Sequence, residues 1–285
     1  MGNTINRFFS PRFLSSNLWF KRLLYGFLLY KCLHWNYYFD FLFADDAVLY
    51  PGYTSIGRFK DLAFLLLNYP GDALSRGFIF VTFFISVYRL FFRSPFWLIS
   101  FGLDLALWFM VMNLQNKMYT GLSGGNILFN QLLLFNCFIS KHSPESGSKL
   151  SEFRLFIQNF SILFLQVQLM LLYFVSALSK LGYSAWLDGS ALQQILQIEH
   201  FSALSFKANN MFSSFFVILL SYTVLAFQLL FPFLVWWKKG KRYFLLFGIL
   251  MHLYIAFFMG LPDFAFVMLL GYLYFWPKHT ELASN

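Results

Sequence analysis

Long, unbroken runs of apolar residues make up most of the chain, and short basic or polar stretches separate them. A membrane-spanning helix needs about 17–25 mostly apolar residues, whereas a barrel strand alternates apolar and polar positions. The runs predict eight helical spans, at 17–39, 74–92, 95–113, 126–140, 156–179, 212–237, 243–259 and 262–276. The fourth and eighth runs are short, so we expect seven or eight crossings, with half-spans covered by neighbouring helices as the alternative.

The fold class expected from this pattern is all-α, a polytopic transmembrane helical bundle that forms a single domain over residues 1–285. Most of the 21 Lys and Arg residues fall on one side of the membrane if the N-terminus is cytoplasmic and the chain crosses eight times. Cytoplasmic loops carry an excess of Lys and Arg. We therefore expect both termini in the cytoplasm, external loops at 40–73 and 180–211, and a multi-pass protein of the cytoplasmic (inner) membrane.

Composition supports the membrane assignment, because 59% of the residues are hydrophobic and only 12% are charged. Soluble domains carry about 25% charged residues. These values exclude a disordered chain, a disulfide scaffold and a cytosolic enzyme. In a membrane protein the net charge of +9 is explained by topology, so membrane lipid is an expected partner and nucleic acid is not. The two cysteines lie in apolar runs, and no metal-ligand spacing occurs.

Ionisable residues inside predicted spans are candidate functional residues, because burying one costs at least about 2.5–3.5 kcal/mol. Asp104 lies in the middle of the third span. It is either a proton carrier or an orienter of a basic group, or one half of an ion pair or hydrogen bond that locks two helices together. The second interpretation is slightly favoured, because a single carboxylate without a recognisable partner specifies no reaction.

The fifth span carries a polar stripe, because Asn159, Gln166, Tyr173 and Lys180 recur every seven residues and so share one helix face. This face is expected to line the bundle interior or a wet cavity. Desolvation there would make Lys180 a usable general base, whereas the alternative is a lysine that reaches to the membrane edge. Spacing alone favours the alternative.

His252 lies in the seventh span, on a face with the small residues Gly248, Ala256 and Gly260. Small residues four apart allow another helix to approach closely. A hydrogen bond across this contact and a role in proton transfer are about equally supported for His252.

Several polar residues fall at predicted external helix ends and define an expected external mouth: Asp45, Asp46, Asn113 and Asp188, with Trp186 beside them. A site that opens to the external side is therefore predicted.

Four segments, in order along the chain, resemble the HTTM family, the horizontally transferred transmembrane domain of vitamin K-dependent γ-carboxylases and their bacterial relatives. Residues 42–51, LFADDAVLYP, are similar to the external Asp-rich turn of the family, and Asn113 with residues 122–126, LSGGN, to its Asn and Ser-Gly-Gly-Asp stretch. Residues 173–181 and 186–192, YFVSALSKL and WLDGSAL, resemble its Tyr, Ala-x-x-Lys-Leu and Trp-x-x-Gly-x-Ala signature. Residues 252–264 are similar to its His, Met-Gly-Leu and Phe helix.

The resemblance implies that Lys180 stands where the carboxylase lysine deprotonates a reduced quinone. A reduced isoprenoid quinone is therefore the cofactor to consider, with Tyr173, Gln166 and Trp186 as its expected binding residues. The carboxylase histidine before the fourth span has no counterpart, since Ser123 to Asn126 fill that stretch, and these 285 residues include no large external substrate domain. Both departures argue against glutamate carboxylation by this chain alone. The short bacterial branch, with a protein that matures a secreted peptide toxin together with a partner protein, is the better analogue.

Two functions follow as hypotheses. In the first, the protein takes part in modification or maturation of a secreted peptide or protein, with Lys180 as base and Asp104 or His252 as orienter or proton relay. In the second, it is a non-catalytic membrane subunit or scaffold of an envelope or secretion complex. Whether the chain is an enzyme stays open.

Overall fold

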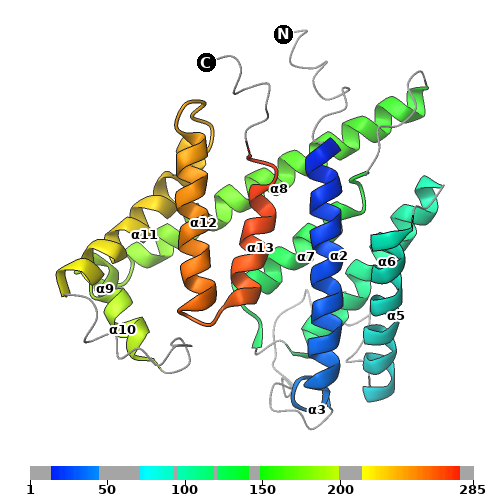
Figure 1. The fold of residues 1–285 in the computed structure, drawn as a ribbon, viewed down its shortest axis with the longest axis horizontal. Helices are drawn as coiled ribbons and strands as arrows, with labels where there is room; N and C mark the ends of the chain where they lie inside the picture. Colours follow the sequence, from blue (N-terminus) through cyan, green and yellow to red (C-terminus); the bar gives the residue numbers. More distant parts are fainter. Residues whose placement is uncertain are drawn as a thin grey trace. The chain divides into compact units, whose positions relative to one another are not determined.

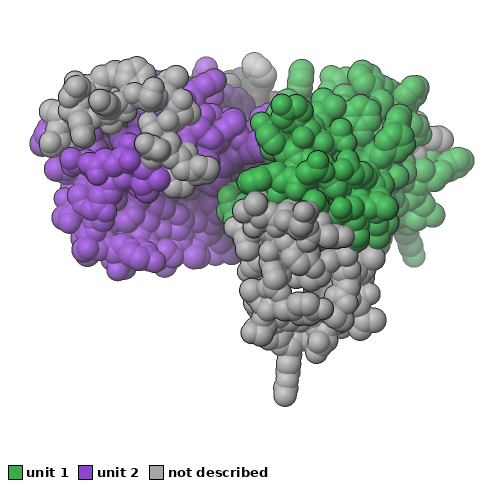
Figure 2. Space-filling model, turned by 90° about the horizontal axis from the view of Figure 1, so that it is seen from below, with its two compact units in different colours: residues 1–162 green, residues 163–285 purple. Residues whose placement is uncertain are grey.

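The chain is all-helical over the residues that its computed structural model describes, which are 14–44, 71–92, 96–118, 121–140, 148–198 and 214–276. No strand occurs within these ranges. The chain divides into two compact units, unit 1 with residues 1–162 and unit 2 with residues 163–285 (Figure 2). The single domain predicted for residues 1–285 stays a prediction.

All eight predicted spans fall on helices (Figure 1). These helices are α2 (Leu14–Tyr37), α5 (Asp72–Phe91), α6 (Trp97–Lys117), α7 (Gly124–Asn136), α8 (Lys149–Leu181), α11 (Ser214–Leu234), α12 (Lys241–Phe257) and α13 (Pro262–Tyr272). Three short helices complete the described elements: α3 (Phe39–Leu42), α9 (Ser184–Leu187) and α10 (Ala191–Gln197).

Four of these helices are long and apolar enough to cross a membrane: α5, α6, α8 and residues 215–234 of α11. The other predicted spans differ in length or charge. Helix α7 has 13 residues, α12 has 17 and α13 has 11, while the 24-residue α2 carries Lys21, Arg22 and Lys31. The structure thus has four candidate membrane-spanning helices, and the larger number of crossings and the orientation of the termini stay predictions.

Unit 1 is built around α2, α5, α6 and α7. Helix α2 packs along α5, α5 packs on α6, and α6 packs on α7. Because only a few residues separate the end of α5 from the start of α6, these two helices run antiparallel. Apolar side chains that include Leu24, Leu107 and Leu132 fill the interior.

Unit 2 contains the C-terminal part of α8 with α11, α12 and α13, and its core is rich in aromatic rings. Phe231 has ring contacts with Tyr173, Tyr272 and Phe275, and the centroids lie 4.2, 5.8 and 5.8 Å away. Helices α12 and α13 pack closely, as their short connection at Gly260 requires.

The predicted external loop at 180–211 is partly helical, since it contains α9 and α10. Both helices contact α11, and the Tyr222 hydroxyl donates a hydrogen bond of 2.7 Å to the Leu187 carbonyl. Gly189 joins α9 to α10 with a φ of 79°, in the left-handed region that favours glycine. The turn therefore holds the segment after Lys180 against α11.

Candidate functional site

Asp104 of unit 1 lies in a buried network of charged and polar side chains from four helices. The carboxylate accepts hydrogen bonds from Lys21 Nζ at 3.0 Å and from the Tyr25 hydroxyl at 2.7 Å. It also accepts two from Arg89, through Nε at 2.9 Å and Nη2 at 2.8 Å. Two parallel bonds between Arg and a carboxylate give a strong and directional ion pair.

Asn136 of α7 completes this network. Lys21 Nζ donates to the Asn136 carbonyl at 3.0 Å and to its Oδ1 at 2.9 Å. The Asn136 amide group donates to the Tyr25 hydroxyl at 3.2 Å. Because four donors already surround the Asp104 carboxylate, the geometry favours its interpretation as a helix-locking ion pair over that of a proton carrier.

The charge pattern counts both basic partners of Asp104 among the residues of the cytoplasmic side, near the ends of their predicted spans. Lys21 and Arg89 are instead buried, at 1% and 4% exposed. Both stand near helix ends, Lys21 in the second turn of α2 and Arg89 in the last turn of α5. The orientation rule counts basic residues near span ends and does not separate those that face solvent from those that turn inward.

Lys180 lies in the last turn of α8 in unit 2, where it is half-buried. Its ammonium group donates to the Ser176 hydroxyl at 2.6 Å and lies 5.2 Å from the ring centre of Trp186. Ser176 in turn donates to Gln228 Oε1 at 3.5 Å. Among the described residues, no carboxylate lies within ion-pair distance of Lys180. Lys180 is thus a cation held by a hydroxyl and an indole instead of by an acid.

His252 and Tyr173 meet in the buried interior of unit 2. The Tyr173 hydroxyl lies 2.5 Å from His252 Nε2 and 2.7 Å from the Tyr272 hydroxyl. All three side chains are buried. If Tyr272 donates to Tyr173 and Tyr173 donates to Nε2, the imidazole proton lies on Nδ1. In that case Nδ1 is a buried donor, and it has no hydrogen-bond partner within the described part of the chain.

The small-residue face of α12 explains how Tyr272 comes so close. A Cβ atom added at Gly248 would meet the Tyr272 hydroxyl and would lie 2.7 Å from Phe227 Cζ. This is the close helix approach expected from the glycine spacing. His252 makes its hydrogen bond from the same helix, one turn after Gly248.

The polar stripe of α8 faces inward as expected, with Asn159, Gln166 and Tyr173 buried. Gln166 Nε2 donates to the Tyr274 carbonyl at 2.7 Å. Gln166 and Tyr173, two of the three predicted cofactor-binding residues, each already make a hydrogen bond within the chain. Only Trp186 of that predicted set lies beside Lys180 at the end of the helix.

The residues of the predicted external mouth have separate locations. Asn113 is buried in α6 and donates to the Phe109 carbonyl of its own helix at 2.7 Å. Asp188 is exposed, and hydrogen bonds from the Ser190 side chain and backbone lower the pKa of its carboxyl group. Asp45 and Asp46 lie outside the described residues.

The predicted site residues that the structure describes thus include three separate groups. The structure brings His252 to Tyr173 and Lys180 to Trp186 in unit 2, whereas Asp104 belongs to unit 1. No hydrogen bond joins Lys180 to His252, and no cluster of three or more metal-ligating side chains occurs in the described ranges.

Comparison of the chain with known protein families, with curated proteins and with solved structures finds no match to any of them. A family and a function for this chain are therefore proposals, argued from its residues and their geometry.

Proposed function

We propose that this chain is an HTTM-type integral protein of the cytoplasmic membrane that helps to modify or mature a secreted peptide or protein. The four long apolar helices support the membrane location. The connection between α11 and α12 supports the orientation, since the exposed Trp236 and Trp237 precede Lys238, Lys239, Lys241 and Arg242. Aromatic residues at the membrane interface followed by basic residues are typical of a cytoplasmic loop. With this loop inside, the Lys180 end of α8 lies outside.

The observation that carries the proposal is the environment of Lys180. Its ammonium group is half withdrawn from water and contacts Ser176 and Trp186, with no described carboxylate as counter-ion. A lysine in such a place is suited to general-base chemistry, because no fixed negative charge holds its proton. In its neutral amine form Lys180 would accept a proton at Nζ, and Ser176 would orient that atom.

A reduced isoprenoid quinone is the cofactor that we propose for this site. The residues of unit 2 fit such a group in two respects. His252 has a buried Nδ1 with no hydrogen-bond partner among the described residues, and Trp186 presents an indole face beside Lys180. Lys180, Trp186 and His252 are the residues that would hold it, and when bound it would supply reducing equivalents. Tyr173 and Gln166 would support the site by fixing α8 against α12 and the end of α13.

A non-catalytic membrane subunit is the second candidate, and the Asp104 network favours it. This network uses its charged groups to join four helices and leaves no acidic group open for chemistry. In that case the protein would dock a partner protein within an envelope or secretion complex.

Variants of Lys180 distinguish the two candidates. Cells that carry the wild-type chain, Lys180→Ala or Lys180→Arg are compared by mass spectrometry of their secreted peptides and by the amount of the protein in the membrane. Lys238→Ala, at an exposed lysine of the opposite loop, is the matched control. If Lys180 is a base, both Lys180 variants lose the peptide modification at normal membrane levels, because arginine does not release its proton. Full function of Lys180→Arg, or loss of membrane protein in Lys180→Ala, supports the subunit instead.

A further inference from the structure

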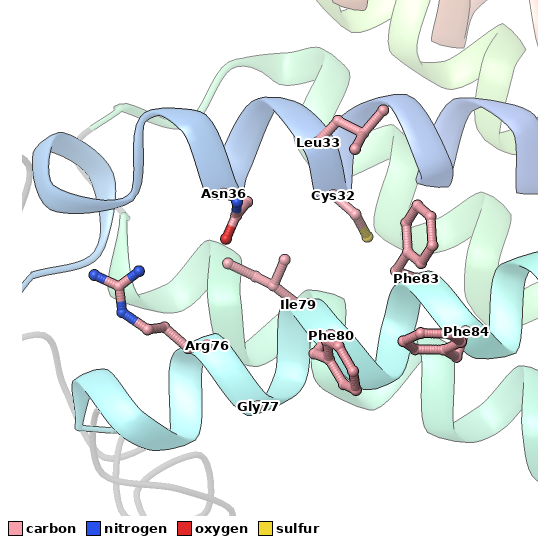
Figure 3. A pocket seen from close by; sticks show the side chains of 9 residues that line it. All are labelled: Cys32, Leu33, Asn36, Arg76, Gly77, Ile79, Phe80, Phe83 and Phe84. Atoms are coloured by element: carbon pink, nitrogen blue, oxygen red, sulfur yellow. The ribbon is translucent and has the colours of Figure 1, made fainter.

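An open groove of about 550 Å³ runs between α2 and α5 of unit 1 (Figure 3). Its buried floor consists of Cys32 and Ile79, and its exposed walls include Leu33, Phe80 and Phe84. A volume of this size is typical of small-ligand sites. The groove includes none of the site residues described above.

The two ends of the groove differ in polarity. Asn36 and Arg76 lie at one end, whereas Phe83 and Phe84 lie at the other (Figure 3). This polar end includes the first turns of α5 and the last turn of α2. On a helix pair in a membrane, the polar end would lie at the interface and the aromatic end deeper in the hydrocarbon. The groove is therefore polar at one end and apolar along the rest, which matches the headgroup and acyl chain of a membrane lipid.

The charges at the polar end come as a pair. Arg76 Nη2 donates to Asp40 Oδ1 at 3.1 Å, and the guanidinium carbon lies 3.7 Å from the ring centre of Phe39. The other N–H groups of Arg76 make no hydrogen bond to a described residue, and the Asp40 side chain is 88% exposed. An arginine with open N–H groups binds phosphate, and an exposed carboxylate binds an ammonium group.

We propose that this groove binds one phospholipid with a zwitterionic headgroup that contains a primary amine, as in phosphatidylethanolamine. One acyl chain lies along Leu33, Ile79 and Phe80. Arg76 and Asn36 bind the phosphate, and Asp40 binds the ammonium group. Charge complementarity selects this headgroup, because an adjacent cation and anion match an adjacent phosphate and amine. The proposal rests on the membrane location of the protein and not on the chemistry of Lys180.

Gly77 allows the groove to be filled without disturbing its walls. It lines the groove, and a Cβ atom added there would meet nothing within 4 Å. Gly77→Leu should therefore fold while its side chain occupies the space of the acyl chain. Gly102→Leu is the matched control, since Gly102 is an exposed helical glycine of α6 with equally open surroundings.

The experiment is native mass spectrometry of the full chain reconstituted with equal amounts of phosphatidylethanolamine and phosphatidylglycerol. The wild-type protein and Gly102→Leu are expected to retain one phosphatidylethanolamine, and Gly77→Leu to lose it. Arg76→Gln should lower retention about tenfold, as expected for the loss of a charge-assisted hydrogen bond, whereas Arg22→Gln, at an exposed arginine of α2, should not. Asp40→Asn should remove the preference for phosphatidylethanolamine over phosphatidylglycerol.

Equal retention by the wild-type protein and Gly77→Leu would overturn the proposal, because the bound lipid would then not occupy the groove. A preference for phosphatidylglycerol in the wild-type protein would overturn the headgroup assignment. Lys180→Ala should keep the lipid. The two sites are thus tested separately. Lys180→Ala should lose the peptide modification and keep the lipid, whereas Gly77→Leu should lose the lipid and keep the peptide modification.

Discussion

The Tyr173 hydroxyl and His252 Nε2 lie 2.5 Å apart and join α8 to α12 in the interior of unit 2. The same hydroxyl lies 2.7 Å from that of Tyr272, so one tyrosine connects three helices. Buried polar groups of this kind stabilise a structure when they are paired and destabilise it when one partner is removed.

Replacing Tyr173 with phenylalanine is expected to destabilise the protein by about 1–3 kcal/mol, because His252 Nε2 and the Tyr272 hydroxyl lose a buried partner. Thermal unfolding in detergent of Tyr173→Phe, His252→Ala and the double variant measures the coupling. The double variant should lose less stability than the sum of the two single variants. Strict additivity would show that the two side chains do not depend on each other.

Asp104 is expected to be the most sensitive charged residue of unit 1. Asp104→Ala leaves Lys21 and Arg89 buried without their acid, which should cost about 3–5 kcal/mol. Asp40→Ala removes the partner of the exposed Arg76 and should cost less than about 1 kcal/mol. Chemical denaturation followed by tryptophan fluorescence compares the two variants. An equally small loss of stability in Asp104→Ala and Asp40→Ala would contradict the buried network.

Two glycines of similar sequence context should respond in opposite directions to alanine. Gly248→Ala forces a methyl group against Tyr272 and Phe227, so it should destabilise the protein by about 1–3 kcal/mol. Gly102→Ala meets open space in a helix and should stabilise by about 0.4–1 kcal/mol. Melting temperatures in detergent test both. A neutral Gly248→Ala would show that α12 and α13 do not approach this closely.

The proposed orientation predicts which side of the membrane each loop occupies. A membrane-impermeant maleimide added to intact cells should label Asp188→Cys, whereas Lys238→Cys should react only after the membrane is opened. Cys32 and Cys137 are buried, so the native thiols should contribute little background. Labelling of Lys238→Cys in intact cells would reverse the orientation and place Lys180 on the cytoplasmic side.

The positions of the helices could be predicted from the apolar runs, because the length and polarity of each run decide where a helix forms. The inward face of α8 could also be predicted, since polar residues seven apart share one side of a helix. The helix against which each face packs could not be predicted from the sequence. The contacts of Tyr173 with His252 and of Asp104 with Lys21 and Arg89 depend on packing between segments far apart in the chain.

Short helices are a second feature in which the structure differs from the sequence-based prediction. The connection after Lys180 was expected to be a loop because it lacks a long apolar run, yet α9 and α10 form there against α11. Helices of four and seven residues gain their stability from such tertiary contacts. A pattern that is read over the length of a membrane span does not detect them.

We propose that unit 2 holds a quinone-linked site at Lys180, and mass spectrometry of quinones that copurify with the detergent-extracted protein tests this proposal most directly. The wild-type protein and Lys238→Ala should carry a stoichiometric quinone, and Lys180→Ala should lose it while folding normally. A wild-type protein that carries only bulk phospholipid and a copurifying partner protein would contradict the claim and identify the chain as a subunit of a complex.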